Sequence, residues 1–167
     1  ALPKQTTPVF SMTIPSLEKT VKYRQFLVKE EKALLIAQQT EDTKVMIDTM
    51  KVVIEGVLLE KLDLNTLAIF DLEYMFLQVR SKSVGEDVDL IFTCDVDHGE
   101  LNDKARSKVK LGIDEIQVVK QDGHTNKIPL FDNVGVIMRY PTLDLAEGMG
   151  DLEDMDNLMI LVAGLID

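Results

Sequence analysis

The spacing of hydrophobic positions changes once within the first forty residues. β-Branched and aromatic residues alternate with polar ones over 9–14 and again over 20–26, on either side of a turn at Pro15, which predicts a β-hairpin. A polar run and then an apolar stripe follow over 29–36 and predict a helix. We therefore expect residues 21–37 to form a strand-to-helix hinge around which the chain is organised.

Helical spacing continues through the next fifty residues. A second helix is predicted behind a cap at Thr40 or Asp42, because its apolar residues recur every three or four positions. A third helix is predicted to open at Asn65 or Thr66 and to stop before Ser83. Its apolar residues cover more than one face, as expected for a helix at the centre of a core.

Alternation returns in the β-rich part of the chain, about 87–141. Strands are predicted over 88–94, 108–119 and 134–140, where apolar residues occupy every second position. The sequence Asp-Gly-His at 122–124 is typical of a hairpin turn. These strands are expected to form one small antiparallel sheet.

The last segment, 151–167, has an acidic first turn and then an apolar run, which predicts a C-terminal helix capped at or near Asp151. No basic residue closes this helix, so we expect it to continue beyond Asp167. Together the patterns predict a single α+β domain over 1–167. It consists of an N-terminal β-hairpin, a helical part at about 28–82, the small sheet and the terminal helix.

Charge and composition exclude several classes of partner. The 167 residues carry a net charge of −11, which argues against nucleic acid because phosphate binding needs clustered lysine and arginine. No window approaches the roughly 18 consecutive apolar residues of a membrane span, so no membrane partner is expected. The charge is uneven: residues 1–36 hold six basic and three acidic positions, whereas 144–167 hold seven acidic and no basic ones. Such polarity can steer a protein partner or keep the surface solvated.

The densest cluster of potential ligands contains Cys94, Asp95, Asp97 and His98. A calcium loop starting at Asp95 would need glycine at its sixth position, where Glu100 stands. Structural zinc needs about four nitrogen or sulfur ligands, and the chain has one cysteine and two histidines. We interpret 94–100 as a solvated hairpin tip. The alternative is a weak metal site in a small metal-binding enzyme or regulator.

Three motifs resemble a known family. They are residues 22–32 (KYRQFLVKEEK), 70–77 (FDLEYMFL) and 80–86 (RSKSVGE). Together they make the chain similar to the T4-type bacteriophage baseplate protein family, and within it to the baseplate hub assembly proteins of T4-like phages. The resemblance covers residues 1–86 and is looser in the β-rich part.

The resemblance implies a non-enzymatic protein without a cofactor, which assembles or builds the hub of a contractile-tail baseplate. The implied partners are phage tail proteins, namely the baseplate hub, the spike lysozyme or the tape-measure protein. The implied location is the host cell cytoplasm during assembly and then the tail baseplate of the virion.

Aromatic and basic residues gather in the hinge, and this combination is enriched at protein interfaces. We therefore predict a partner-binding surface made of Tyr23, Arg24, Phe26, Lys29 and Lys32. The alternative interpretation is that the same residues form the edge of a core strand and the solvated start of a helix.

Overall fold

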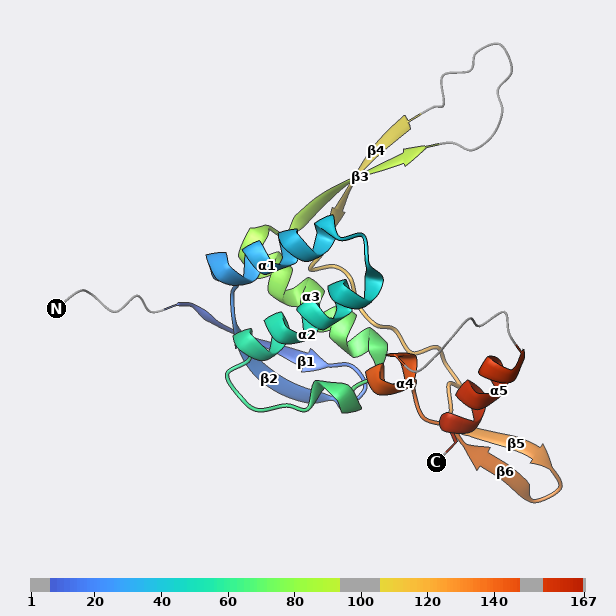
Figure 1. Cartoon of the computed structure of the whole chain (residues 1–167). Coiled ribbons are helices and arrows are strands. Elements are labelled where there is room, and N and C mark those ends of the chain that lie inside the picture. The colour runs from blue at the N-terminus through green and yellow to red at the C-terminus, as the bar shows by residue number, and fades with distance from the viewer. Residues whose placement is uncertain (1–6, 94–105, 148–154, 167) are drawn as a thin grey trace, which may run out of the picture.

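The computed structural model describes residues 7–93, 106–147 and 155–166 as an α+β fold, which confirms the predicted class (Figure 1). Within these ranges the strands lie in three separate antiparallel pairs, β1–β2, β3–β4 and β5–β6, and not in the single small sheet that alternation predicted. The elements in chain order are β1 (Val9–Ile14), β2 (Lys19–Arg24), α1 (Val28–Gln39), α2 (Thr43–Val57), the 3₁₀ turn η1 (Leu64–Thr66), α3 (Ile69–Val84), β3 (Asp87–Thr93), β4 (Arg106–Gly112), β5 (Lys127–Phe131), β6 (Val134–Ile137), α4 (Leu143–Glu147) and α5 (Met155–Gly164).

The N-terminal hairpin is confirmed. β1 and β2 pair antiparallel with Met12 opposite Val21, and alternate residues of both strands face the protein interior. α1 begins at Val28, directly after the hairpin, so the strand-to-helix hinge is also confirmed. The apolar stripe on α1 is less buried than its pattern suggested, because Leu35 and Ile36 are each 55% exposed.

The second and third helices follow the prediction with shifted boundaries. Asp42 caps α2 by accepting hydrogen bonds from two backbone N–H groups of its first turn. α3 begins at Ile69 and not at Asn65 or Thr66, because those residues belong to η1 and the chain is extended at Leu67. α3 also runs on to Val84, beyond the predicted end.

α3 is the central helix of the core, as its apolar circumference predicted. It contacts β1 on one side and α2 on another, and α2 in turn packs beside α1. The core residues come from the hairpin, α2, η1, α3 and the start of α4: Met12, Ile14, Val21, Tyr23, Ile54, Val57, Leu64, Leu67, Leu72, Met75, Val79 and Leu143. The N-terminal two thirds of the chain therefore supply nearly all of this core.

β4 ends earlier than alternation predicted. The strand stops at Gly112 because Ile113 turns into the protein and is 1% exposed, so the prediction of a strand over 108–119 was wrong beyond residue 112. A turn does form at 121–124, where the His124 N–H donates to the Gln121 carbonyl, but it joins no hairpin strands. In this part of the chain the hairpin lies later: it connects β5 and β6 through 132–133, and β5 was not predicted.

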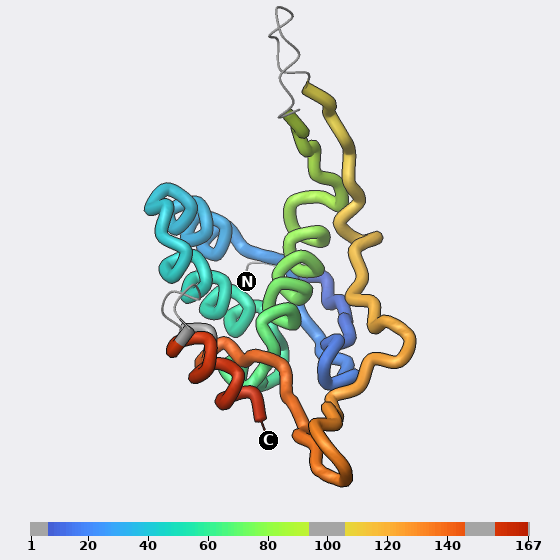
Figure 2. Tube along the Cα trace, turned by 90° about the vertical axis from the view of Figure 1, so that its right-hand side faces the viewer, coloured from blue at the N-terminus to red at the C-terminus, as the bar shows by residue number. Residues whose placement is uncertain are grey.

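The C-terminal elements pack against one another at one end of the molecule. The backbone N–H of Arg139 donates to the Leu165 carbonyl at 2.8 Å, and the Arg139 guanidinium donates to the Gly164 carbonyl. α5 thus lies beside the end of β6, while the β3–β4 pair extends from the opposite end (Figure 2). The predicted cap at Asp151 lies outside the described residues. No helix in the described part of the chain is long and apolar enough to cross a membrane.

Candidate protein-binding surfaces

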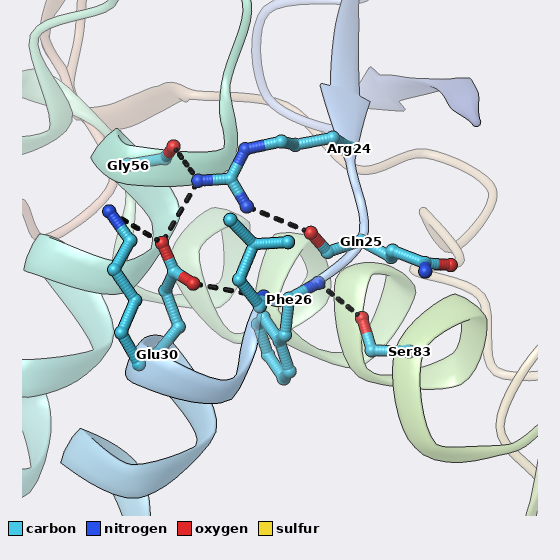
Figure 3. Close-up of polar contacts among 8 residues, drawn as sticks. Arg24, Gln25, Phe26, Glu30, Gly56 and Ser83 are labelled. Carbon is cyan, nitrogen blue, oxygen red and sulfur yellow. Dashed lines mark hydrogen bonds and ion pairs between the residues drawn. The ribbon is translucent and has the colours of Figure 1, made fainter. Parts of the chain in front are cut away.

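The hinge is held by a nearly buried ion pair (Figure 3). Arg24 donates to the Glu30 carboxylate at 2.9 Å, to the Gly56 carbonyl at 2.7 Å and to the Gln25 carbonyl at 2.9 Å. The other carboxylate oxygen of Glu30 accepts the backbone N–H of Leu27, the residue before α1, at 2.9 Å. The Glu30 side chain therefore caps α1. Because Arg24 also binds the Gly56 carbonyl, the same contacts connect β2 to the end of α2.

A second set of contacts joins the hinge to α3. The backbone N–H of Phe26 donates to the Ser83 hydroxyl at 2.8 Å, and that hydroxyl donates to the Val79 carbonyl at 2.6 Å. The Phe26 ring lies 6.1 Å from the Phe76 ring, centroid to centroid. The path of the chain from β2 into α1 is thus set from both sides (Figure 3).

Glu30 is ionised more readily than an ordinary glutamate. Burial by itself would raise the pKa of this carboxyl group, but the hydrogen bonds from Arg24 and from the Leu27 N–H, with the positive charge of Arg24, outweigh it. The net effect lowers the pKa of Glu30 below its ordinary value of 4.5. The ion pair is therefore present at neutral pH.

The predicted partner-binding residues fall into two groups. Tyr23 faces the core, because it is 1% exposed and lies with Val21 on the buried side of β2. Arg24 is occupied by the hinge contacts, and its side chain is 15% exposed. Phe26 is half-buried, whereas Lys29 and Lys32 are exposed on α1. The structure brings Arg24 and Lys29 together at Glu30.

A groove beside the hinge, of about 340 Å³, was not predicted from the sequence. We call it the hinge groove; it is lined by Phe26, Glu31, Leu34, Leu35, Gln38, Met46, Phe76, Arg80 and Val84 from the hinge and helices α1, α2 and α3. Its walls are mainly apolar. One guanidinium nitrogen of Arg80, Nη1, is buried, and no group in the described part of the chain accepts a hydrogen bond from it.

Exposed apolar side chains also gather on α5 and on the strand pairs β3–β4 and β5–β6. On α5, Met159 is 64% and Ile160 is 68% exposed, although the segment is apolar almost throughout. A helix of this composition is ordinarily covered on most sides. The unbroken apolar run was the signal in the sequence, but only the structure shows that the described parts of the chain leave Met159 and Ile160 exposed.

The metal candidates Cys94, Asp95, Asp97 and His98 lie outside the described residues. Within the described ranges, no group of three or more histidine, cysteine, aspartate or glutamate side chains is arranged to hold a metal ion.

Fold and surfaces together define an α+β protein whose distinctive surface features are exposed apolar side chains on projecting elements. Residues 7–167 match the family described as T4 bacteriophage base plate protein, and the chain belongs to this family. Comparison with curated proteins and with solved structures finds no match.

Proposed function

We propose that this protein is a non-enzymatic assembly factor or structural component of the baseplate hub of a contractile phage tail, and that it acts by binding other tail proteins. The family match supports a role in the baseplate. The observation that carries the rest is the exposure of large apolar side chains on α5 and on the β5–β6 pair. Extended apolar surface of this kind usually marks a protein interface.

We place the first partner contact at the hinge groove. Its apolar walls can receive an aliphatic or aromatic side chain of a partner. Lys29 and Lys32 are exposed on the same helix as the groove residue Leu35 but do not line the groove, whose own charged residues are Glu31 and Arg80. The partner surface is therefore expected to be apolar where it enters the groove.

The expected partners are the hub, the spike lysozyme or the tape-measure protein, met in the host cytoplasm during assembly and retained in the baseplate. The test is a pull-down of a tagged full-length chain from phage-infected cells, with co-purifying proteins quantified by mass spectrometry. One or more of these tail proteins at a fixed ratio to the tagged chain supports the proposal. Their absence under conditions that recover other tail subassemblies contradicts it.

Matched variants locate the contact. Leu35→Glu puts a charge in the hinge groove and is expected to reduce capture at least tenfold, the effect of losing a central apolar contact. Val52→Glu is the control, because Val52 is exposed on α2 and does not line the groove. Lys32→Glu, which keeps the contact between Lys29 and Glu30, is expected to weaken capture more at low salt than at high salt. Equal capture by the Leu35 and Val52 variants would move the contact away from the groove.

A further inference from the structure

The β3–β4 pair stands apart from the rest of the protein. β3 and β4 pair with each other in register from Asp87 opposite Gly112 to Thr93 opposite Arg106, and in the described part of the chain no further strand joins either outer edge. Both views show the pair projecting from the body at the end away from β5 and β6 (Figures 1 and 2). A two-stranded pair with no covering layer is marginally stable in water.

The two faces of this pair differ. One face carries the apolar side chains Val88, Leu90, Phe92, Val109 and Leu111, with Ser107 opposite Phe92 as its one polar position. Phe92 is 58% exposed and Val109 is 42% exposed. The other face carries the charged residues and Ile91. This alternation of apolar and charged faces is typical of a sheet whose apolar face is buried.

The charges are separated by strand. The charged residues of β3 are both acidic, Asp87 and Asp89, and those of β4 are all basic, Arg106, Lys108 and Lys110. Within one copy the opposite signs meet, since the Lys110 ammonium lies 2.6 Å from the Asp87 carboxylate. Each outer edge therefore presents a single sign of charge.

This separation selects among the ways in which two copies can pair their edges. Joining β3 to β3 would place acid against acid, and joining β4 to β4 would place base against base, which is unfavourable across a strand pair. Joining β3 of one copy to β4 of another repeats the acid-to-base arrangement that already exists within the copy. In the same register Lys110 of one copy would stand opposite Asp89 of the next, as it stands opposite Asp89 in its own copy.

We propose that several copies of this chain associate through their β3–β4 pairs, with the outer edge of β3 in one copy hydrogen-bonded to the outer edge of β4 in the next. Copies related by a common rotation axis place these strands antiparallel, as they are within each copy. The interface is head-to-tail, so it closes into a ring when the rotation allows. Closure turns the apolar faces inward and leaves the charged faces in water.

The closed form is a small β-barrel. Barrels of about six to eight strands have an interior that side chains can fill, so three or four copies are expected. The apolar residues of each copy would fill the barrel, and pairing every edge would remove the exposed strands that otherwise promote aggregation. This self-association goes beyond the binding of other tail proteins and does not depend on it.

The test is the mass of the purified 167-residue chain, measured by light scattering during size exclusion and by native mass spectrometry over a hundredfold range of concentration. The expected mass is about three or four times the 18.8 kDa of one copy. Leu90→Asn, on the inward face, is expected to yield single copies. Ile91→Asn is the matched control, because Ile91 is on the outer face and is 59% exposed. It should leave the mass unchanged.

Charge supplies a second variant. Replacing Arg106 and Lys108 together by glutamate leaves Lys110 as the one basic residue of β4, places acidic side chains on both strands and should also yield single copies. An unchanged circular dichroism spectrum and melting temperature of the body would show that these variants remain folded. A wild-type chain that stays single at every concentration overturns the proposal, as does equal loss of association in the Leu90 and Ile91 variants. A single-copy wild-type chain that still captures tail proteins refutes only the self-association and leaves the proposed function standing.

Discussion

Replacing Arg24 with methionine tests how the hinge is held. Methionine keeps much of the aliphatic volume but removes the three hydrogen bonds to Glu30, Gly56 and Gln25. Glu30, whose side chain is 7% exposed, would then be a buried carboxylate that keeps its backbone hydrogen bonds and the exposed Lys29 ammonium but has lost its guanidinium partner. Leaving one member of a buried ion pair unpaired costs about 3 kcal/mol of unfolding free energy.

Urea unfolding followed by far-ultraviolet circular dichroism measures this loss. A change of about 3 kcal/mol corresponds to a fall in melting temperature of roughly 6–12 °C in a domain of this size. Adding Glu30→Gln to the Arg24→Met variant removes the unpaired charge, so the double variant is expected to be more stable than Arg24→Met alone. An Arg24→Met protein within about 0.5 kcal/mol of wild type, the range of ordinary surface substitutions, would refute this account of the hinge.

The same contacts decide how the partner surface is tested. A substitution of Arg24 by glutamate places a second carboxylate beside Glu30, where like charges repel, so lost binding in that variant would report lost folding. Lys29→Glu would do the same, because the Lys29 ammonium lies 3.4 Å from the Glu30 carboxylate. Lys32 is exposed and its charge can be reversed while both contacts of Glu30 are kept. Tests of the partner surface therefore use Lys32 and Leu35.

Three further predictions concern Glu30, the buried Asp71 and the crowded Gly135. The pKa of Glu30 is lower in the folded state, so the stabilisation that its carboxylate contributes is fully present above pH 4.5 and is lost as the pH falls through the folded-state pKa. As the pH is lowered from 7 to 3, the free energy of unfolding should therefore decrease more steeply in wild type than in Glu30→Gln. Asp71→Ala should lower the free energy of unfolding by about 3 kcal/mol, because the buried carboxylate accepts hydrogen bonds from the Ser16 N–H at 2.9 Å, the Ser16 hydroxyl and the Ala68 N–H. Ser16→Ala should lower it by only about 1 kcal/mol. Comparable urea midpoints for the two variants would contradict this ranking. Gly135→Ala would place a methyl group 2.8 Å from the carbonyl oxygen of the facing strand, so hydrogen exchange should speed up in β5 and β6 and stay unchanged in α3; unchanged exchange in β5 and β6 would show that the strands adjust to it.

The sequence determined those parts of the protein whose signals are local. Alternation and turn chemistry predicted the β1–β2 hairpin, and the side chain of Asp42 predicted the start of α2. The apolar circumference of α3 predicted its central position. Each of these features depends on residues within a few positions of one another, so the sequence pattern alone carries the information. Motif similarity over the N-terminal half also indicated the family that residues 7–167 match.

Only the tertiary structure decided which patterned faces are covered. Alternation is the same whether a strand packs on its own core or stands in solvent, so the pattern did not distinguish buried β1–β2 from projecting β3–β4. It also did not show that Tyr23 faces the core while Lys29, a few residues later, faces solvent. The Arg24–Glu30 pair needs the Gly56 carbonyl from a different helix, and the hinge groove needs four segments. Whether a side chain is buried depends on contacts between elements that are far apart in the sequence, and these contacts form only when the whole chain packs.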